Sequence, residues 1–230
     1  MSVPAETLGA LVAGREQARL VAVAAPESAA AEQYRILLAR LDRAAVARPL
    51  RAIAITSCTR GEGRSTTAAN LALTAAREGR ETALVEGDLR RPGLAQLFDV
   101  APRVGLAEVA EGRAELAQAL VRVGGVTLLC AGEARDPAAA MRSPRIAATV
   151  DALRSSFPLV LVDAPTALFL SDGSHLAASM DGIILVVRAG ETPRDLVRMA
   201  IDALPQRLLG IVLNGVDEPG YARHLKAEAA

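Results

Sequence analysis

Short apolar runs that alternate with longer helix-like segments constrain the fold of this 230-residue chain more than any other feature. Each run is almost continuously apolar, which is typical of strands that are buried on both faces of a parallel sheet. We therefore predict a doubly wound α/β fold, with a mainly parallel sheet and helices on both of its faces. The predicted strands cover residues 52–56, 82–85, 126–130, 159–162, 183–187 and 209–213.

Composition limits the classes of function. Lys plus Arg and Asp plus Glu number 26 each, a balance that predicts no nucleic-acid partner. The cysteines, Cys58 and Cys130, fit a reducing compartment and are interpreted as small packing residues. No apolar run reaches the length of a membrane span, and the N-terminus lacks a signal-peptide pattern. We expect a cytoplasmic protein that is able to dock on a membrane protein.

The chain divides into a leader and one domain. Residues 1–26 lack a clear period and predict a loosely ordered leader, with a short helix near residues 6–17. Residues 27–230 form the predicted nucleotide-binding domain, which begins with a helix over 27–46. Pro49 separates this helix from the first strand.

A glycine-rich segment, residues 57–66, lies between the first strand and a predicted helix. That context is the one a phosphate-binding loop needs, because backbone N–H groups and the helix N-terminus then face the phosphates. Arg64 stands at the position of the usual lysine, and Ser65 at that of the hydroxyl that ligates Mg²⁺. The residues predicted to bind ATP or ADP here are Arg60, Gly61, Glu62, Gly63, Arg64, Ser65 and Thr66.

Acidic residues follow two other strands. Glu86 and Asp88 lie at the end of the second strand, two residues apart, so their side chains are expected on the same side. Asp163 closes the fourth strand, where a carboxylate supports Mg²⁺ through water. We predict catalytic roles for Arg64, Glu86 and Asp88, and a metal site formed by Ser65, Asp88 and Asp163. The alternatives are a structural acidic turn at residues 86–88 and a helix N-cap at Asp163.

Asn214 follows the last predicted strand. Its side chain either contacts a nucleotide base or belongs to a turn that tolerates positive φ. The sequence does not decide between the two.

These motifs together resemble the bacterial tyrosine kinase (BY-kinase) family, over about residues 32–216. Residues 61–72 are similar to the family's Walker A motif, residues 84–92 to its Walker A′ motif, and residues 32–37 to the helix that precedes its ATPase core. The resemblance implies a P-loop NTPase of the deviant-Walker, MinD-like class, with ATP or ADP and Mg²⁺ as cofactors. It also implies a role in exopolysaccharide or capsule biosynthesis and a membrane-embedded polysaccharide co-polymerase as partner. A homo-oligomer is a further implication.

Four departures from the family pattern concern activity. Arginine replaces the Walker A lysine at position 64, and glutamate replaces the first Walker A′ aspartate at position 86. Leu38 stands at the last place of the ring-forming Glu-x-x-Arg-x-x-Arg pattern. The usual C-terminal tyrosine cluster is reduced to Tyr221. Arginine is longer and planar and does not replace lysine unchanged.

Three functions follow from these features. The first is an active tyrosine autokinase, and the second is a weak or inactive relative that acts as a nucleotide-switched partner in polysaccharide export. The third, a ParA/MinD-type partitioning ATPase, is disfavoured because Thr59 stands where that class has a second signature lysine.

Overall fold

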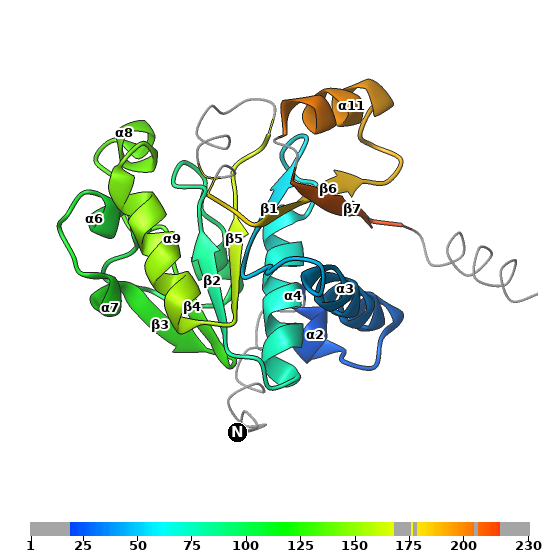
Figure 1. The fold of residues 1–230 in the computed structure, drawn as a ribbon, viewed down its shortest axis with the longest axis horizontal. Coiled ribbons are helices and arrows are strands. Elements are labelled where there is room, and N and C mark those ends of the chain that lie inside the picture. The colour runs from blue at the N-terminus through cyan, green and yellow to red at the C-terminus, as the bar shows by residue number, and fades with distance from the viewer. Residues whose placement is uncertain (1–18, 168–175, 177–178, 205–206, 217–230) are drawn as a thin grey trace, which may run out of the picture.

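A seven-stranded sheet with helices on both faces forms the centre of the molecule (Figure 1). The computed structural model describes residues 19–167, 176, 179–204 and 207–216. The strands are β1 (Ala52–Ser57), β2 (Thr82–Glu86), β3 (Leu120–Val123), β4 (Val126–Leu129), β5 (Leu159–Asp163), β6 (Gly182–Arg188) and β7 (Leu208–Asn214). The helices are α2 (Val21–Ala24), α3 (Ala29–Ala45), α4 (Arg64–Arg77), α5 (Leu94–Leu97), α6 (Leu106–Ala110), α7 (Leu116–Ala119), α8 (Pro137–Met141), α9 (Pro144–Ser156) and α11 (Arg194–Ala203).

The strand order is β3-β4-β2-β5-β1-β6-β7, and every pair is parallel except β3 with β4. The prediction of a mainly parallel, doubly wound sheet is therefore confirmed, and each predicted run corresponds to one strand. The sequence did not predict β3, an antiparallel edge strand that follows α7 directly and is only half-buried.

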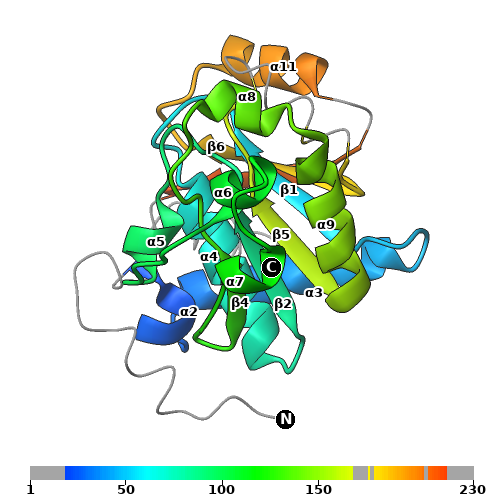
Figure 2. The ribbon, with the colours of Figure 1, turned by 90° about the vertical axis from the view of Figure 1, so that its left-hand side faces the viewer.

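Two large aliphatic cores separate the sheet from most of its helices, and a smaller cluster lies under α11. One contains side chains of α2, α3, α4 and α5, and the other contains side chains of α6, α8 and α9. Figure 1 shows α3 and α4 on one side of the sheet and α9 on the other, and Figure 2 looks onto the side that carries α6, α8 and α9. Because the chain has few aromatic residues, leucine, isoleucine, valine and alanine fill nearly every core position.

The last residues of the predicted leader are described by the structure and pack on the domain. Leu20 and Ala22 are buried against α4, and the backbone N–H of Ala22 donates to Oδ1 of Asn70 at 2.9 Å. The described part of the expected leader, residues 19–26, thus packs on the core. The short helix expected near residues 6–17 and Tyr221 both lie outside the described residues.

The sheet topology brings three strand ends together. β5 lies between β1 and β2, and the register pairs Asp163 with Ile55 on one side and with Glu86 on the other. Because all three strands are parallel, their carboxyl ends meet at one edge, where ligands of open α/β sheets bind. The glycine-rich segment leaves β1 at this edge and enters α4.

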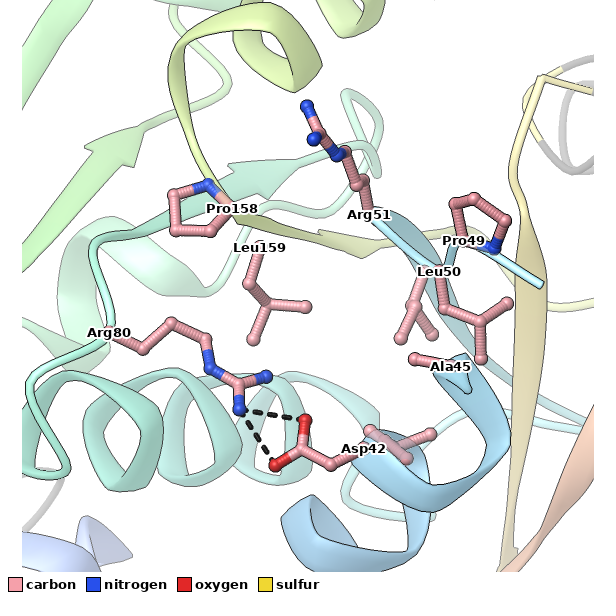
Figure 3. Close-up of a pocket in the computed structure, with 10 residues that line it drawn as sticks. Asp42, Ala45, Pro49, Leu50, Arg51, Arg80, Pro158 and Leu159 are labelled. Atoms are coloured by element: carbon pink, nitrogen blue, oxygen red, sulfur yellow. Dashed lines mark hydrogen bonds and ion pairs between the residues drawn. The ribbon is translucent and has the colours of Figure 1, made fainter. Parts of the chain in front are cut away.

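A cavity of about 270 Å³ lies at the opposite edge, beside the amino ends of β1 and β5 (Figure 3). Leu50, Leu159 and Ala45 line it with apolar groups, and an ion pair between Arg80 and Asp42 closes one side at 2.7 Å. This ion pair lies just beyond the C-terminal end of α4 and is half-exposed. Among the described residues, no helix is both long and apolar enough to cross a membrane.

Candidate functional site: a phosphate-binding loop with an internal arginine

The glycine-rich loop and the strand ends enclose a cavity of about 410 Å³. Its lining combines loop residues with residues that follow β2. The lining residues are Arg19, Ser57, Arg60, Gly61, Gly63, Arg64, Ser65, Thr66, Asp88, Arg91, Gly93, Gln96 and Leu97. Four of these carry a guanidinium and one carries a carboxylate, so the cavity is cationic. A cationic cavity at a helix N-terminus suits a polyphosphate.

Gly63 lets the loop turn into α4. Its φ is +90°, a left-handed conformation that side chains rarely adopt, and it is the N-cap residue of α4. A Cβ at this position would lie 2.0 Å from Nδ2 of Asn214. Glycine is therefore required here for two reasons, the backbone conformation and the close contact with Asn214.

Asn214 braces the loop from the end of β7. Its Nδ2 donates to the carbonyl oxygen of Glu62 at 2.8 Å. This contact is a role that the sequence analysis did not consider: the side chain holds the phosphate-binding loop against the sheet. It does not line the cavity that the loop encloses.

Glu62 also supports the loop instead of facing the cavity. Its Oε2 accepts from the backbone N–H of Thr59 at 3.0 Å, and its Oε1 accepts from the hydroxyl of Thr192. The side chain is buried and does not line the cavity. Glu62 and Asn214 therefore fix the loop conformation, and their predicted direct contact with nucleotide stays a prediction.

Arg64 points to the strand ends and binds both predicted metal-supporting aspartates. Its Nε donates to Oδ1 of Asp163 at 2.6 Å, and its Nη2 donates to Oδ2 of Asp88 at 2.9 Å. Burial acts to lower the pKa of the guanidinium, but Asp163 and Asp88 together hold that pKa above its ordinary value. The side chains of Arg64, Asp88 and Asp163 are 11%, 9% and 0% exposed, so this is a largely buried charge cluster.

Glu86 is turned away from the cavity. Its Oε2 accepts from the backbone N–H groups of Gly93 and Leu94 at 2.7 and 2.8 Å, at the start of α5. Burial raises the pKa of Glu86 well above its ordinary value, and the charge of Asp163 raises it further. We assign the proton to Glu86 because Asp163 has the guanidinium as counter-ion. The structure thus gives Glu86 a structural contact, and its predicted catalytic role stays a prediction.

The three residues predicted to hold Mg²⁺ do lie together, but their carboxylates are engaged. The hydroxyl of Ser65 is close enough to Asp163 to oppose the rise that burial causes in the pKa of that aspartate. Asp88 and Asp163 each bind Arg64, and Oδ2 of Asp163 is buried without a hydrogen-bond partner. In a phosphate-binding loop Mg²⁺ is held by a hydroxyl, one or two carboxylates and phosphate oxygens, so these carboxylates would have to leave Arg64 to serve it. In this arrangement the residues do not fit Mg²⁺.

Two arginines that the sequence analysis did not predict as site residues also line the cavity. Arg91 follows Asp88 in the acidic turn, and Arg19 belongs to the segment that packs on α4. The Asp-Leu-Arg-Arg-Pro string is a signal that could have pointed to Arg91. No local pattern marks Arg19, which reaches the site only through the packing of the N-terminal segment.

The cysteines have the packing role that we expected. Both are buried, and burial raises the pKa of the Cys58 thiol to about 11 and that of Cys130 to about 12. A thiol with so high a pKa is a poor nucleophile and a poor metal ligand at neutral pH.

The helix α3 carries the ring-forming pattern, and two residues of the pattern form an exposed ion pair on it. Arg35 pairs with Glu32 at 2.6 Å and also donates to the carbonyl oxygen of Pro26 at 2.9 Å. Leu38, at the last place of the pattern, is fully buried in the core.

Fold and site define a domain of the P-loop type, and similar proteins identify its family. No family model matches the chain. The tyrosine-protein kinase YwqD of Bacillus subtilis is 31% identical over 207 residues, which are 87% of each chain. The succinoglycan biosynthesis transport protein ExoP of Rhizobium meliloti is 35% identical over 86% of this chain and 26% of its own. This chain belongs to the bacterial tyrosine kinase family, as its motifs predicted.

Solved structures agree with this assignment. The kinase domain of Escherichia coli tyrosine kinase ETK matches with a TM-score of 0.83 and 27% identity, over 86% of this chain and 80% of that one. The septum site-determining protein MinD of Pyrococcus horikoshii, solved with Mg-ADP, matches with a TM-score of 0.59 and 24% identity, over 76% of each chain. The second match concerns the fold alone, which this chain shares with MinD.

Proposed function

We propose that this chain binds ATP or ADP in the loop cavity and acts in exopolysaccharide or capsule biosynthesis, with weak or absent transfer of phosphate to tyrosine. The observation that carries the proposal is the position of Arg64. Its guanidinium binds Asp88 and Asp163, whereas a Walker A lysine faces the phosphates.

Nucleotide binding rests on the loop and on the charge of the cavity. Gly61 and Gly63 adopt left-handed conformations that let backbone N–H groups approach phosphate oxygens closely. Arg60 and Arg91 line the same cavity and supply positive charge beside them. These groups are independent of Arg64, so affinity for the phosphates persists even though Arg64 is engaged elsewhere.

Weak transfer follows from what phosphoryl transfer requires. Catalysis of this reaction is positioning plus stabilisation of charge that develops on the transferred group. Arg64 already donates hydrogen bonds to two carboxylates, and Glu86 already accepts a hydrogen bond from the backbone at the start of α5. Neither side chain is placed to serve the reacting phosphate or to accept a proton from an incoming tyrosine.

We further propose a cytoplasmic position beside a membrane-embedded polysaccharide co-polymerase. Support comes from the relatives, since ExoP is a transport protein of polysaccharide biosynthesis and is about four times as long as the segment it shares with this chain. Self-association through α3 has less support, because Leu38, at the last place of the pattern, belongs to the core.

The test combines calorimetry with a phosphotyrosine blot. We expect ADP to bind the purified chain, and we expect autophosphorylation well below that of a family member that has the full motif set. Absence of ADP binding at millimolar concentration would contradict the first half of the proposal. A phosphotyrosine signal as strong as the reference kinase would contradict the second half.

Arg64→Lys is the companion variant. If the engaged arginine limits turnover, lysine at this position raises the rate of ATP hydrolysis, because lysine is shorter and lacks the planar fork by which Arg64 binds the two aspartates through separate nitrogens. An unchanged rate would show that Glu86 or another departure limits turnover. Arg80→Lys, at the far end of α4, is the matched control and leaves the rate as in wild type.

A further inference from the structure

Arg64 stands where a hydrated cation would otherwise balance the two aspartates. The guanidinium reaches one carboxylate through Nε and the other through Nη2, so a single side chain bridges the end of β5 and the turn after β2. This bridge is internal to the protein and needs no ligand.

The remaining oxygens of the two aspartates offer little to a metal ion. Oδ1 of Asp88 accepts from the backbone N–H groups of Arg90 and Arg91 at 3.3 and 3.1 Å. Oδ2 of Asp163 has no hydrogen-bond partner among the described residues, but that carboxylate is 0% exposed and Arg64 lies against it. Mg²⁺ keeps several of its waters and needs room for a near-octahedral shell, which a buried single oxygen does not give.

The cavity meanwhile supplies its own positive charge. Arg60 and Arg91 line it beside the loop backbone, and Asp88, the acidic residue in the lining, is already neutralised by Arg64. Phosphate charge can therefore be balanced without a divalent cation.

We infer that nucleotide binding by this chain is nearly independent of Mg²⁺, because Arg64 acts as the built-in counter-ion of Asp88 and Asp163. This inference rests on the proposed binding of ATP or ADP in the same cavity. It makes Arg64 the residue that determines the metal requirement of the site.

The first test is a calorimetric titration of ADP into the wild-type chain, once with excess Mg²⁺ and once with excess EDTA. We expect the two dissociation constants to agree within about threefold. A larger strengthening by Mg²⁺ would overturn the inference, since it would mean that the phosphates draw Arg64 off the aspartates and free them for the cation.

Arg64→Lys sharpens this titration. Lysine is shorter and lacks the fork that reaches both aspartates through separate nitrogens, which opens them to the cation, so the variant should bind ADP about tenfold or more tightly with Mg²⁺ than with EDTA. Arg80→Lys makes the same chemical change at the far end of α4 and should keep the wild-type ratio. A ratio in Arg64→Lys equal to that of wild type would contradict the role given to Arg64.

The second test needs no nucleotide. The melting temperature of the wild-type chain should not rise with Mg²⁺, whereas that of Arg64→Ala should rise, because the variant exposes two unneutralised carboxylates to the cation. A rise in wild type overturns the inference, and the wild-type measurement decides alone if the variant does not fold. If ADP binds in neither buffer, the proposed function is contradicted. The inference about Arg64 is then tested by the melting temperatures alone.

Discussion

An arginine–aspartate ion pair lies at each end of helix α4, and the two differ in almost every physical respect. Arg64 opens the helix and binds Asp163 and Asp88 at 11% exposure, whereas Arg80 follows the helix and binds Asp42 at 29% exposure. The helix dipole favours a cation at the end where Arg80 lies and disfavours one at the end where Arg64 lies. Only the two buried carboxylates make the position of Arg64 favourable. The comparison teaches that burial and partner number, and not the local helix field, decide the role of each arginine.

We expect Arg64→Ala to lower the free energy of unfolding more than the other substitutions. Removing one partner of a buried ion pair leaves uncompensated charge in the interior, which typically costs about 3–5 kcal/mol. Here Asp88 and Asp163 would both lose their counter-ion. Urea denaturation should show this loss in the free energy of unfolding. A loss of unfolding free energy below about 1 kcal/mol would mean that the ion pairs of Arg64 contribute no more than exposed pairs do, which contradicts the difference between the two ends of α4.

Gly63→Ala should have the next largest effect, with Gly79→Ala as its matched control at the other end of α4. Both glycines have positive φ, but a Cβ at Gly63 meets the side chain of Asn214 at 2.0 Å, whereas one at Gly79 meets nothing within 4 Å. We expect Gly63→Ala to cost about 1–3 kcal/mol and to abolish ADP binding. Gly79→Ala should cost about 1 kcal/mol and leave binding intact. Equal ADP affinity in the two variants would contradict the role of the loop.

Glu86, at the end of β2, makes the stability of the folded chain depend on pH. The pKa of Glu86 is raised in the folded chain, mainly by burial and then by Asp163, so the folded state holds this proton more strongly than the unfolded state. Its contribution to stability is complete below the ordinary glutamate pKa and is lost as pH rises through the raised value. The free energy of unfolding of wild type should therefore fall as pH rises, and Glu86→Gln should show a smaller fall. A steeper fall in the variant would contradict the assignment of the proton to Glu86.

Arg80→Ala should have the smallest effect. Its ion pair with Asp42 is half-exposed and lies at the edge of the smaller cavity in Figure 3. Exposed pairs of this kind contribute about 0.2–1 kcal/mol. Urea denaturation should place Arg80→Ala within about 1 kcal/mol of wild type. A cost comparable to that of Arg64→Ala would remove the contrast between the two ends of the helix.

The sequence predicted the sheet and the loop because apolar runs and glycine spacing are local signals. It did not predict β3, whose residues continue directly from a short helix and are half-buried at the sheet edge. From the topology of parallel strands we also expected Arg64, Asp88 and Asp163 at one edge of the sheet. The partners of the guanidinium were not predictable, because the direction of this side chain depends on packing from three separate segments.

Glu86 and Asn214 illustrate the same limit. The spacing of Glu86 and Asp88 predicted a shared side, but the longer Glu86 side chain reaches the backbone at the start of α5, and only Asp88 lines the cavity. The sequence offered a base contact or a turn for Asn214 and gave no sign of its hydrogen bond to the loop carbonyl of Glu62. Both contacts join segments far apart in the sequence, which no local pattern records.

The most direct test of the account is a pair of double-mutant cycles, one for Arg64 with Asp88 and one for Arg80 with Asp42. Each cycle isolates the energy that couples the two side chains. We predict a coupling of about 2 kcal/mol or more at the buried pair and less than about 1 kcal/mol at the exposed pair. A coupling between Arg64 and Asp88 no larger than that between Arg80 and Asp42 would contradict the claim that Arg64 serves as the internal counter-ion of this site.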